Sequence, residues 1–241
     1  MAAQVLALLD LRGDERVLDV GCGDGRISAR IAEQLVPSGS VCGTDASADM
    51  IGFAQRQHAN VPNLRFIVAD ARQLGFDGGF DAVVSFNALH WVPQLLPALC
   101  GMRAALSAGG RGWLRLVTQG PVVSIEAVAE QVRRAAEWAP LFAGFDDPYL
   151  RLEPAQVATQ ASSAGLRVLS LHTRLECWDF GNRAELFGFC SAGFGAWTRR
   201  LPEDRHDAFV GTVLDQYLAS RVDVSPTVFR YYQTDLAFSM A

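Results

Sequence analysis

The chain has 241 residues and a formal net charge of -5; half of its residues are hydrophobic and a fifth are charged, so we expect a packed core. No apolar run reaches the roughly 18 residues that a membrane helix needs, and no basic stripe suggests nucleic acid as a partner. All 21 basic residues are arginines, which excludes a catalytic lysine.

In the first half of the chain, short apolar runs alternate with amphipathic stretches, as in βαβ units with a parallel sheet. Five strands are predicted, at Arg16–Val20, Val41–Thr44, Leu64–Val68, Asp81–Phe86 and Gly112–Thr118. Three helices are predicted, at Gly25–Leu35, about Ser47–His58, and Pro93–Leu106 with Ala108-Gly109-Gly110 as its terminator.

The second half has a less regular pattern. It predicts helices at Val122–Trp138 and Leu152–Gly165, and strands at Leu166–Leu175 and Phe229–Ser239. The roughly 50 residues between these two strands carry too much aromatic surface for an exposed loop. They form either a helical cap over a site or a helix layer packed on the sheet. Eight side chains, five of them in this segment, are candidates for a pocket lining or for the core: Trp138, Phe142, Phe145, Trp178, Phe187, Phe194, Trp197 and Arg199.

The most specific pattern is VLDVGCGDG, at Val17–Gly25. A buried strand runs directly into Gly21, Gly23 and Gly25, which permit a tight turn with positive φ and a close approach of a ligand. The following helix points its first amides at that ligand. A dinucleotide-binding turn would need a glycine at position 26, where the chain has Arg26.

Acidic residues lie at the ends of three successive strands: Asp19, Asp45 and Asp70. Because the carboxyl ends of parallel strands meet at one edge of a sheet, these carboxylates are placed along one extended ligand. Asp45 follows Gly25 by 20 residues, a spacing that favours hydrogen bonds to ribose hydroxyls. The alternative for Asp45 and Asp70 is an ordinary cap or turn residue.

Two segments resemble known proteins. DVGCGDG resembles the first motif of class I S-adenosylmethionine-dependent methyltransferases. The exit of the fourth strand, VSFNALHWVPQ, resembles small-molecule methyltransferases of the trans-aconitate, malonyl carrier-protein and juvenile-hormone-acid type. The resemblance implies a Rossmann-like, seven-stranded, mostly parallel sheet with helices on both faces and an aromatic-rich helical insertion before the last strand.

The resemblance also implies S-adenosylmethionine as cofactor and a role for each matching residue. Asp19 would help to hold the ammonium group, the glycines would accommodate the methionine part, and Asp70 with the Ala71 amide would bind adenine. The cofactor-binding residues expected on this basis are Asp19, Gly21, Cys22, Gly23, Gly25, Asp45, Ala46, Met50, Asp70, Ala71 and Asn87.

His90 and Trp91 match a polar–Trp pair that helps some relatives to place a substrate carboxylate, although His90 stands where glutamine is more common. His90 is also our candidate for a general base, because imidazole titrates near neutral pH; His172 and His206 are weaker candidates. A carboxylate acceptor would need no base. Core packing of Trp91 and a purely structural His90 are the alternatives.

We therefore expect a single domain, 1–241, in which 1–120 bind the cofactor and about 122–150 and 176–227 are insertions on the substrate side. The relatives usually carry a further 20 to 40 residues before the first strand. Either the aromatic insertion replaces that segment, or the site is more open, or the start of the chain is shortened.

The expected function is methyl transfer from S-adenosylmethionine to a small molecule, on O, N or C. The alternatives are a non-catalytic cofactor-binding relative and, disfavoured by Arg26 and the absence of lysine, a nicotinamide oxidoreductase. The five cysteines include no C-x-x-C pair, so we expect neither a disulfide framework nor a metal site. The N-terminus shows no secretory signal, and a cytoplasmic location is expected.

Overall fold

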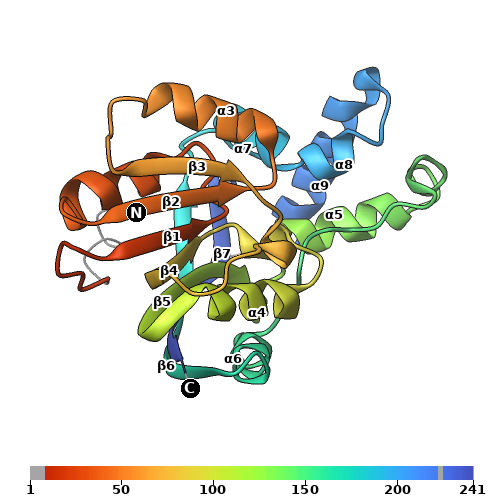
Figure 1. Cartoon of the computed structure of the whole chain (residues 1–241). Coiled ribbons are helices and arrows are strands. Elements are labelled where there is room, and N and C mark those ends of the chain that lie inside the picture. Colours follow the sequence, from red (N-terminus) through yellow and green to blue (C-terminus); the bar gives the residue numbers. More distant parts are fainter. Residues whose placement is uncertain (1–8, 222–224, 241) are drawn as a thin grey trace. The chain divides into compact units, whose positions relative to one another are not determined.

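A computed structural model describes residues 9–221 and 225–240 of the chain (Figure 1). The first eight residues of the expected domain and residues 222–224 of the expected insertion therefore lie outside the described residues. The described chain forms two compact units. The first contains 9–117, 152–173 and 234–240, and the second contains 118–151 and 174–233 without 222–224. The expected division at residue 120 stays a prediction.

In the described part of the chain, seven strands form one sheet in the order β3-β2-β1-β4-β5-β7-β6. The strands are β1 (Arg16–Val20), β2 (Ser40–Asp45), β3 (Leu64–Val68), β4 (Phe80–Phe86), β5 (Leu106–Thr118), β6 (Leu166–Asp179) and β7 (Val228–Met240). Strand β1 pairs in parallel with β2 and β4, β2 with β3, and β4 with β5. The boundary between the two units falls within β6 and β7.

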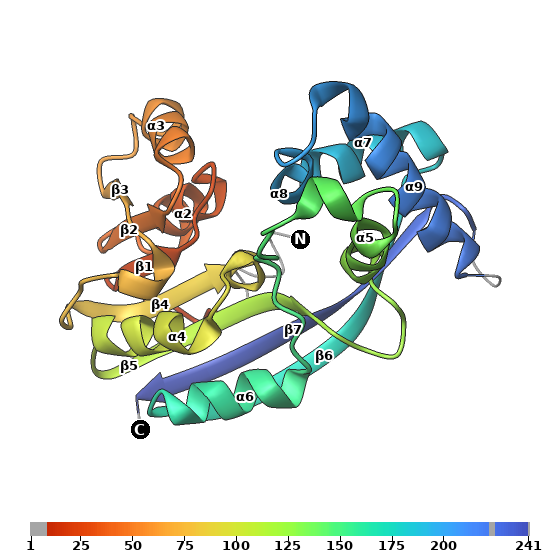
Figure 2. The ribbon, with the colours of Figure 1, turned by 90° about the vertical axis from the view of Figure 1, so that its right-hand side faces the viewer.

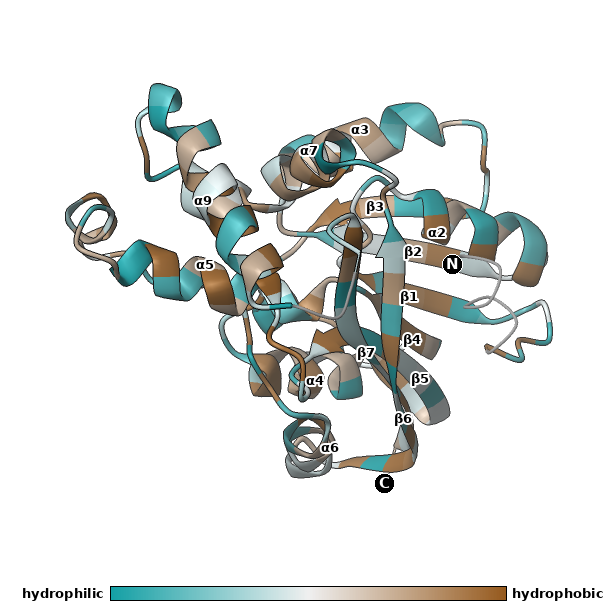
Figure 3. Ribbon diagram, turned by 180° about the vertical axis from the view of Figure 1, so that it is seen from behind, coloured by the Kyte–Doolittle hydropathy of each residue, from teal (hydrophilic) through white to brown (hydrophobic). Residues whose placement is uncertain are grey.

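Strand β7 is antiparallel to β5. Gly112 on β5 lies against Phe238 on β7, and Arg115, three residues later on β5, contacts Asp235, three residues earlier on β7. The predicted fold class, a Rossmann-like and mostly parallel seven-stranded sheet, is thereby confirmed. The strands were predictable because β1 and β4 are mostly apolar and buried along nearly their whole length, as expected for strands covered on both faces. Figure 3 shows both strands mostly in brown, whereas α2 alternates between brown and teal.

The helices of the first unit follow the predicted positions. They are α2 (Arg26–Arg30), continued by the π-helical turn η1 (Ile31–Leu35), then α3 (Ala48–Gln57), α4 (Leu95–Ala105) and α6 (Pro154–Ser163). The hydroxyl of Ser47 accepts the Met50 amide and caps α3. A capping box between Glu153 and Gln156 begins α6. Helix α6 packs beside α4 (Figure 2).

The prediction that Ala108-Gly109-Gly110 terminates a helix is wrong. Helix α4 ends at Ala105, and β5 begins at the next residue. Gly109 lies inside β5 with a φ of 76°, where the pairing with β4 shifts its register. The glycines form a bulge in the strand, because positive φ serves a bulge as well as a helix end.

The second unit is mainly helical. Its helices and turns are α5 (Ile125–Arg134), η4 (Ala139–Phe142), α7 (Arg183–Gly193), α8 (Gly195–Thr198), η5 (Glu203–Arg205) and α9 (His206–Ala219). Helix α9 packs against α5 and α7. The rings of Trp138 and Phe142 each lie 5.2 Å from that of Phe209, and Trp197 is fully buried against Phe194.

These rings form the core of the second unit. Of the two alternatives that the sequence left open for them, a pocket lining or a core, the structure therefore shows the core. Within 9–221 and 225–240, no helix has the length and apolar character needed to cross a membrane.

Candidate functional site

The turn between β1 and α2 is built on three glycines in left-handed conformations. The φ angles of Gly21, Gly23 and Gly25 are 76°, 55° and 78°. The amides of Gly21 and Cys22 donate to the carbonyl oxygen of Thr44 on β2, at 2.7 and 2.9 Å. The turn is thus fixed to the neighbouring strand, and other residues rarely adopt its conformation.

Space excludes side chains at two of these positions. A Cβ atom on Gly21 would lie 2.2 Å from the Cβ of Ala88, which follows β4. A Cβ atom on Gly25 would lie 2.5 Å from the ring of Phe66 on β3. The glycine turn therefore brings the ends of β1 and β4 closer together than a side chain would allow.

Asp45 connects the end of β2 with this turn. Its Oδ2 accepts the Gly23 amide at 3.0 Å, and its Oδ1 accepts the Ser47 amide at 2.9 Å. Ser47, and not Asp45, caps α3, whereas the contact of Asp45 with the Ser47 amide is the turn alternative that the sequence left open. Ala46 and Met50 are both exposed, and the end of the Met50 side chain lies next to Gly23. Three of the predicted residues, Gly23, Asp45 and Met50, thus lie together.

The Asp70 carboxylate is hydrogen-bonded to Arg72, two residues later in the chain. Its carboxylate caps the 3₁₀ turn η2 (Ala71–Gln73) by accepting the Arg72 amide, and it also binds the Arg72 guanidinium at 2.6 Å. The hydrogen bond from Arg72 lowers the pKa of Asp70 below its ordinary value. This is the cap alternative left open by the sequence, and contact of Asp70 and Ala71 with adenine stays a prediction.

Asp19 is buried beneath the glycine turn. It is 1% exposed, and one carboxylate oxygen accepts the hydroxyl of Ser28 on α2 at 2.6 Å. Burial, with a smaller contribution from the nearby Asp45 carboxylate, raises the pKa of Asp19 to about 6. The side chain therefore ties β1 to α2, and its contact with a ligand ammonium group stays a prediction.

A cavity of about 530 Å³ opens beside the glycine turn. It is lined by Gly21, Cys22, Gly23, Asp24, Arg26, Ile27, Arg30, Phe86, Asn87 and Arg115. Four of these were predicted as cofactor-binding residues: Gly21, Cys22, Gly23 and Asn87. The other seven predicted residues do not line it: Asp19, Gly25, Asp45, Ala46, Met50, Asp70 and Ala71. Sequence reasoning missed Arg115, whose only signal was an arginine inside the apolar run WLRLV.

Asn87 directly follows β4 and has an unusual conformation. Its φ is 54°, a left-handed value that asparagine tolerates better than most residues. Its amide donates to the carbonyl oxygen of Arg115 at 2.8 Å. The backbone of β4 therefore turns at the cavity while it remains attached to β5.

His90 lies in the 3₁₀ turn η3 (Leu89–Trp91) and is 4% exposed. The Val117 amide donates to its Nδ1 at 3.2 Å, which requires that nitrogen to be unprotonated. Burial lowers the pKa of His90 to about 3. A general base works best with a pKa near the working pH, so the geometry favours a neutral, structural His90, and its catalytic role stays an untested prediction. The half-buried Trp91 ring lies 5.7 Å from the His90 ring.

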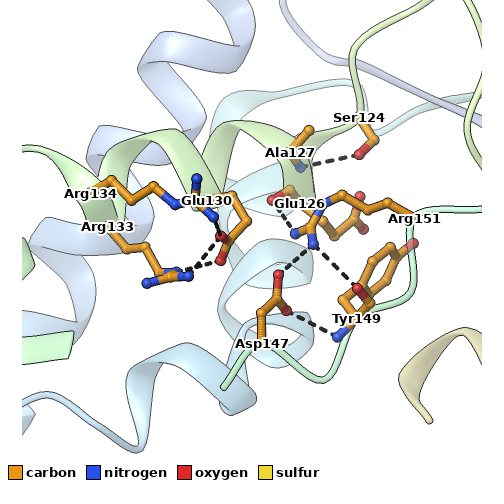
Figure 4. A network of polar contacts seen from close by, with 9 residues as sticks. All are labelled: Ser124, Glu126, Ala127, Glu130, Arg133, Arg134, Asp147, Tyr149 and Arg151. Carbon is orange, nitrogen blue, oxygen red and sulfur yellow. Dashed lines mark hydrogen bonds and ion pairs between the residues drawn. The ribbon is translucent and has the colours of Figure 1, made fainter. Parts of the chain in front are cut away.

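A second cluster of charged residues lies in the second unit (Figure 4). Arg151 forms an ion pair with Asp147 and donates to the carbonyl oxygens of Tyr149 and Glu126, while Glu130 binds Arg133 and Arg134. These charges are paired with one another and join the segment before α6 to α5. We therefore assign the cluster a structural role. No group of three or more His, Cys, Asp or Glu side chains suited to a metal ion occurs in the described ranges.

Comparison with known proteins adds independent information. Residues 17–110 match the family described as "Methyltransferase domain". The juvenile hormone acid O-methyltransferase of Drosophila melanogaster is 26% identical over 211 residues, covering 84% of this chain and 71% of that protein. The trans-aconitate 2-methyltransferase of Deinococcus radiodurans is 37% identical over 109 residues, covering 45% of this chain and 40% of that protein.

A solved structure extends the likeness to the whole chain. Phosphoethanolamine N-methyltransferase 2 of Haemonchus contortus, in complex with phosphomonomethylethanolamine and S-adenosylhomocysteine, has a TM-score of 0.63 and 17% sequence identity. The match covers 99% of this chain and 51% of that protein. At this identity the likeness concerns the fold.

The glycine turn gives a first prediction. Gly21→Ala adds a methyl group that meets Ala88, in addition to the left-handed φ, whereas Gly75→Ala has the same φ problem (70°) with no atom within 4 Å. We expect Gly75→Ala to lower the free energy of unfolding by about 1–2 kcal/mol and Gly21→Ala to lower it by at least twice as much. Urea denaturation measures both, and equal losses would contradict the steric argument.

The buried Asp19 gives a second prediction. Its ordinary pKa of 3.8 becomes about 6 in the folded chain, so the native state keeps this proton to higher pH than the unfolded state. Ionisation of Asp19 therefore destabilises the native state progressively as pH rises from 4 to 6, by on the order of 3 kcal/mol. Asp19→Asn removes the titration.

We expect the free energy of unfolding of Asp19→Asn, minus that of the unchanged protein, to increase by this amount between pH 4 and pH 7. Urea denaturation at several pH values measures the difference. A difference that does not vary with pH would show that Asp19 titrates normally.

Proposed function

We propose that the chain, whose residues 17–110 match a methyltransferase domain, transfers a methyl group from S-adenosylmethionine to a small-molecule acceptor by in-line displacement. The observation that carries this proposal is the cavity beside the glycine turn. Its volume of about 530 Å³ falls within the roughly 300–1,000 Å³ of small-molecule sites. It lies at the carboxyl ends of β1 and β4, where ligands bind in open α/β sheets.

The residues at this edge fit the proposed cofactor. The glycine turn offers backbone without side chains at Gly21 and Gly23, and Asn87, directly after β4, lines the same cavity. Asp45 has two carboxylate oxygens at the end of β2, each already placed by a backbone amide. We propose that Gly21, Cys22, Gly23 and Asn87 hold the methionine part and that Asp45 accepts the ribose hydroxyls. The S-adenosylhomocysteine bound by the Haemonchus enzyme supports this choice of cofactor.

S-adenosylmethionine, when bound, supplies a methyl group already activated by a sulfonium. The protein then has to align the acceptor and exclude water. Proton removal from the acceptor is the remaining task, and His90 is poorly suited to it, since it is buried and its Nδ1 accepts the Val117 amide. We propose that His90 instead holds η3 against β5, so that Trp91 keeps its place beside the end of β4. An acceptor atom that is unprotonated at neutral pH fits this arrangement.

The proposal predicts that the purified protein binds both S-adenosylmethionine and S-adenosylhomocysteine. Asp45→Asn should weaken both by roughly tenfold or more, because hydrogen bonds to a charged group are lost. Asp81→Asn is the matched control, since Asp81 lies near the amino end of β4, away from the cavity, in an exposed ion pair with Arg16. Isothermal titration calorimetry gives the dissociation constants. A folded protein that binds neither compound would refute the proposal.

A further inference from the structure

A buried ion pair lies behind the cavity. Arg115 on β5 and Asp235 on β7 have side chains that are 1% and 3% exposed. The Nε and Nη2 atoms of Arg115 donate to the two carboxylate oxygens of Asp235, at 2.6 and 2.8 Å. This bidentate arrangement uses one edge of the planar guanidinium and fixes its orientation.

The third nitrogen of the guanidinium, Nη1, takes no part in this ion pair. Nη1 of Arg115 is buried and has no hydrogen-bond partner among the described residues. Buried polar groups are nearly always hydrogen-bonded, so an exception calls for a physical explanation. Arg115 also belongs to the lining of the cavity beside the glycine turn. A ligand in that cavity would supply the missing acceptor.

The position of Arg115 in the sheet is suited to this task. It pairs with Phe86 near the carboxyl end of β4, and its carbonyl oxygen accepts the Asn87 amide. Asn87 and the glycine turn line the same cavity. The guanidinium is thus attached to the strand ends at which the proposed reaction takes place.

The charges around the cavity favour an anion. Three arginines line it, namely Arg26, Arg30 and Arg115, against one carboxylate, Asp24. Asp24 is already paired with Arg26 at 2.7 Å. Arg26 and Arg30 are four residues apart and therefore lie on one side of α2. Since Asp24 compensates Arg26 and Asp235 compensates Arg115, the charge of Arg30 leaves the lining of the cavity with a net positive charge.

We infer that Arg115 binds a ligand carboxylate in this cavity through Nη1, with Asp235 as the positioning residue that fixes the guanidinium plane. The inference rests on the proposed function and deepens it. A carboxylate can come from two sources: the α-carboxylate of the cofactor or a carboxylate on the acceptor. Both present a planar pair of oxygens to a guanidinium.

The test compares S-adenosylmethionine with its decarboxylated form by calorimetry, on the unchanged protein and on Arg115→Lys. The lysine keeps a positive charge opposite Asp235 but lacks Nη1. Arg111→Lys is the matched control, because Arg111 is on the same strand and does not line this cavity. Should Arg115→Lys fail to fold, the double variant Arg115→Met/Asp235→Leu replaces the pair with apolar groups.

If the cofactor is the source, Arg115→Lys weakens S-adenosylmethionine roughly tenfold or more and leaves the decarboxylated compound unchanged. If the carboxylate belongs to the acceptor, the variant binds S-adenosylmethionine and its decarboxylated form as well as the unchanged protein does. In that case trans-aconitate, benzoate and decanoate are titrated with S-adenosylhomocysteine present. At least one binds the unchanged protein, its methyl ester does not, and Arg115→Lys abolishes the binding.

Equal binding of every compound by Arg115→Lys and Arg111→Lys would overturn the inference, as would the absence of any carboxylate-dependent binding. Failure of the proposed function gives a different result. In that case the unchanged protein binds neither S-adenosylmethionine nor its decarboxylated form.

Discussion

The left-handed backbone at Gly21, Gly23 and Gly25 is the constraint on which the rest of the site depends. It turns the chain from β1 into α2 within a few residues, while the Thr44 carbonyl oxygen holds the turn to β2. Because Gly21 lacks a side chain, Ala88 after β4 can lie against it. The ends of β1, β2 and β4 are therefore brought together, and the cavity opens beside the glycine turn, next to the end of β4 and Arg115 on β5.

Several features that are unfavourable for stability gather around this cavity. Asp19 is a carboxyl buried beneath the turn, Asn87 has a left-handed φ, and Arg115 has a buried nitrogen without a partner among the described residues. Natural folds retain such features mainly at functional sites, where the surrounding structure compensates for them. Their concentration at one edge of the sheet agrees with the proposed location of methyl transfer.

The sequence predicted the first unit well because its signals are local. The strands β1 to β4 are apolar runs next to turn residues, and the glycine spacing distinguished this turn from a dinucleotide-binding one. Gly109 was misassigned because a positive φ is common to helix ends and strand bulges. Asp70 and Arg72 are two residues apart, yet nothing in the sequence indicated that they would pair.

The remaining differences come from long-range contacts. The burial of His90 depends on Val117, 27 residues later, and the role of Arg115 depends on Asp235, 120 residues later. Neither contact has a periodicity that a single sequence reveals. In the same way, Trp138 is a core residue because α9 supplies Phe209. The site residues on β1 and β2 could therefore be predicted, and those that depend on β5 and β7 could not.

We propose that the glycine turn and the strand ends next to it form the cofactor site. The most direct test is to follow backbone amide chemical shifts by NMR during titration with S-adenosylhomocysteine. We expect the largest changes at Gly21, Gly23, Ala46, Ala71 and Asn87, with helix α9 unaffected. A folded protein whose amide shifts do not change, or change only in the second unit, would contradict it.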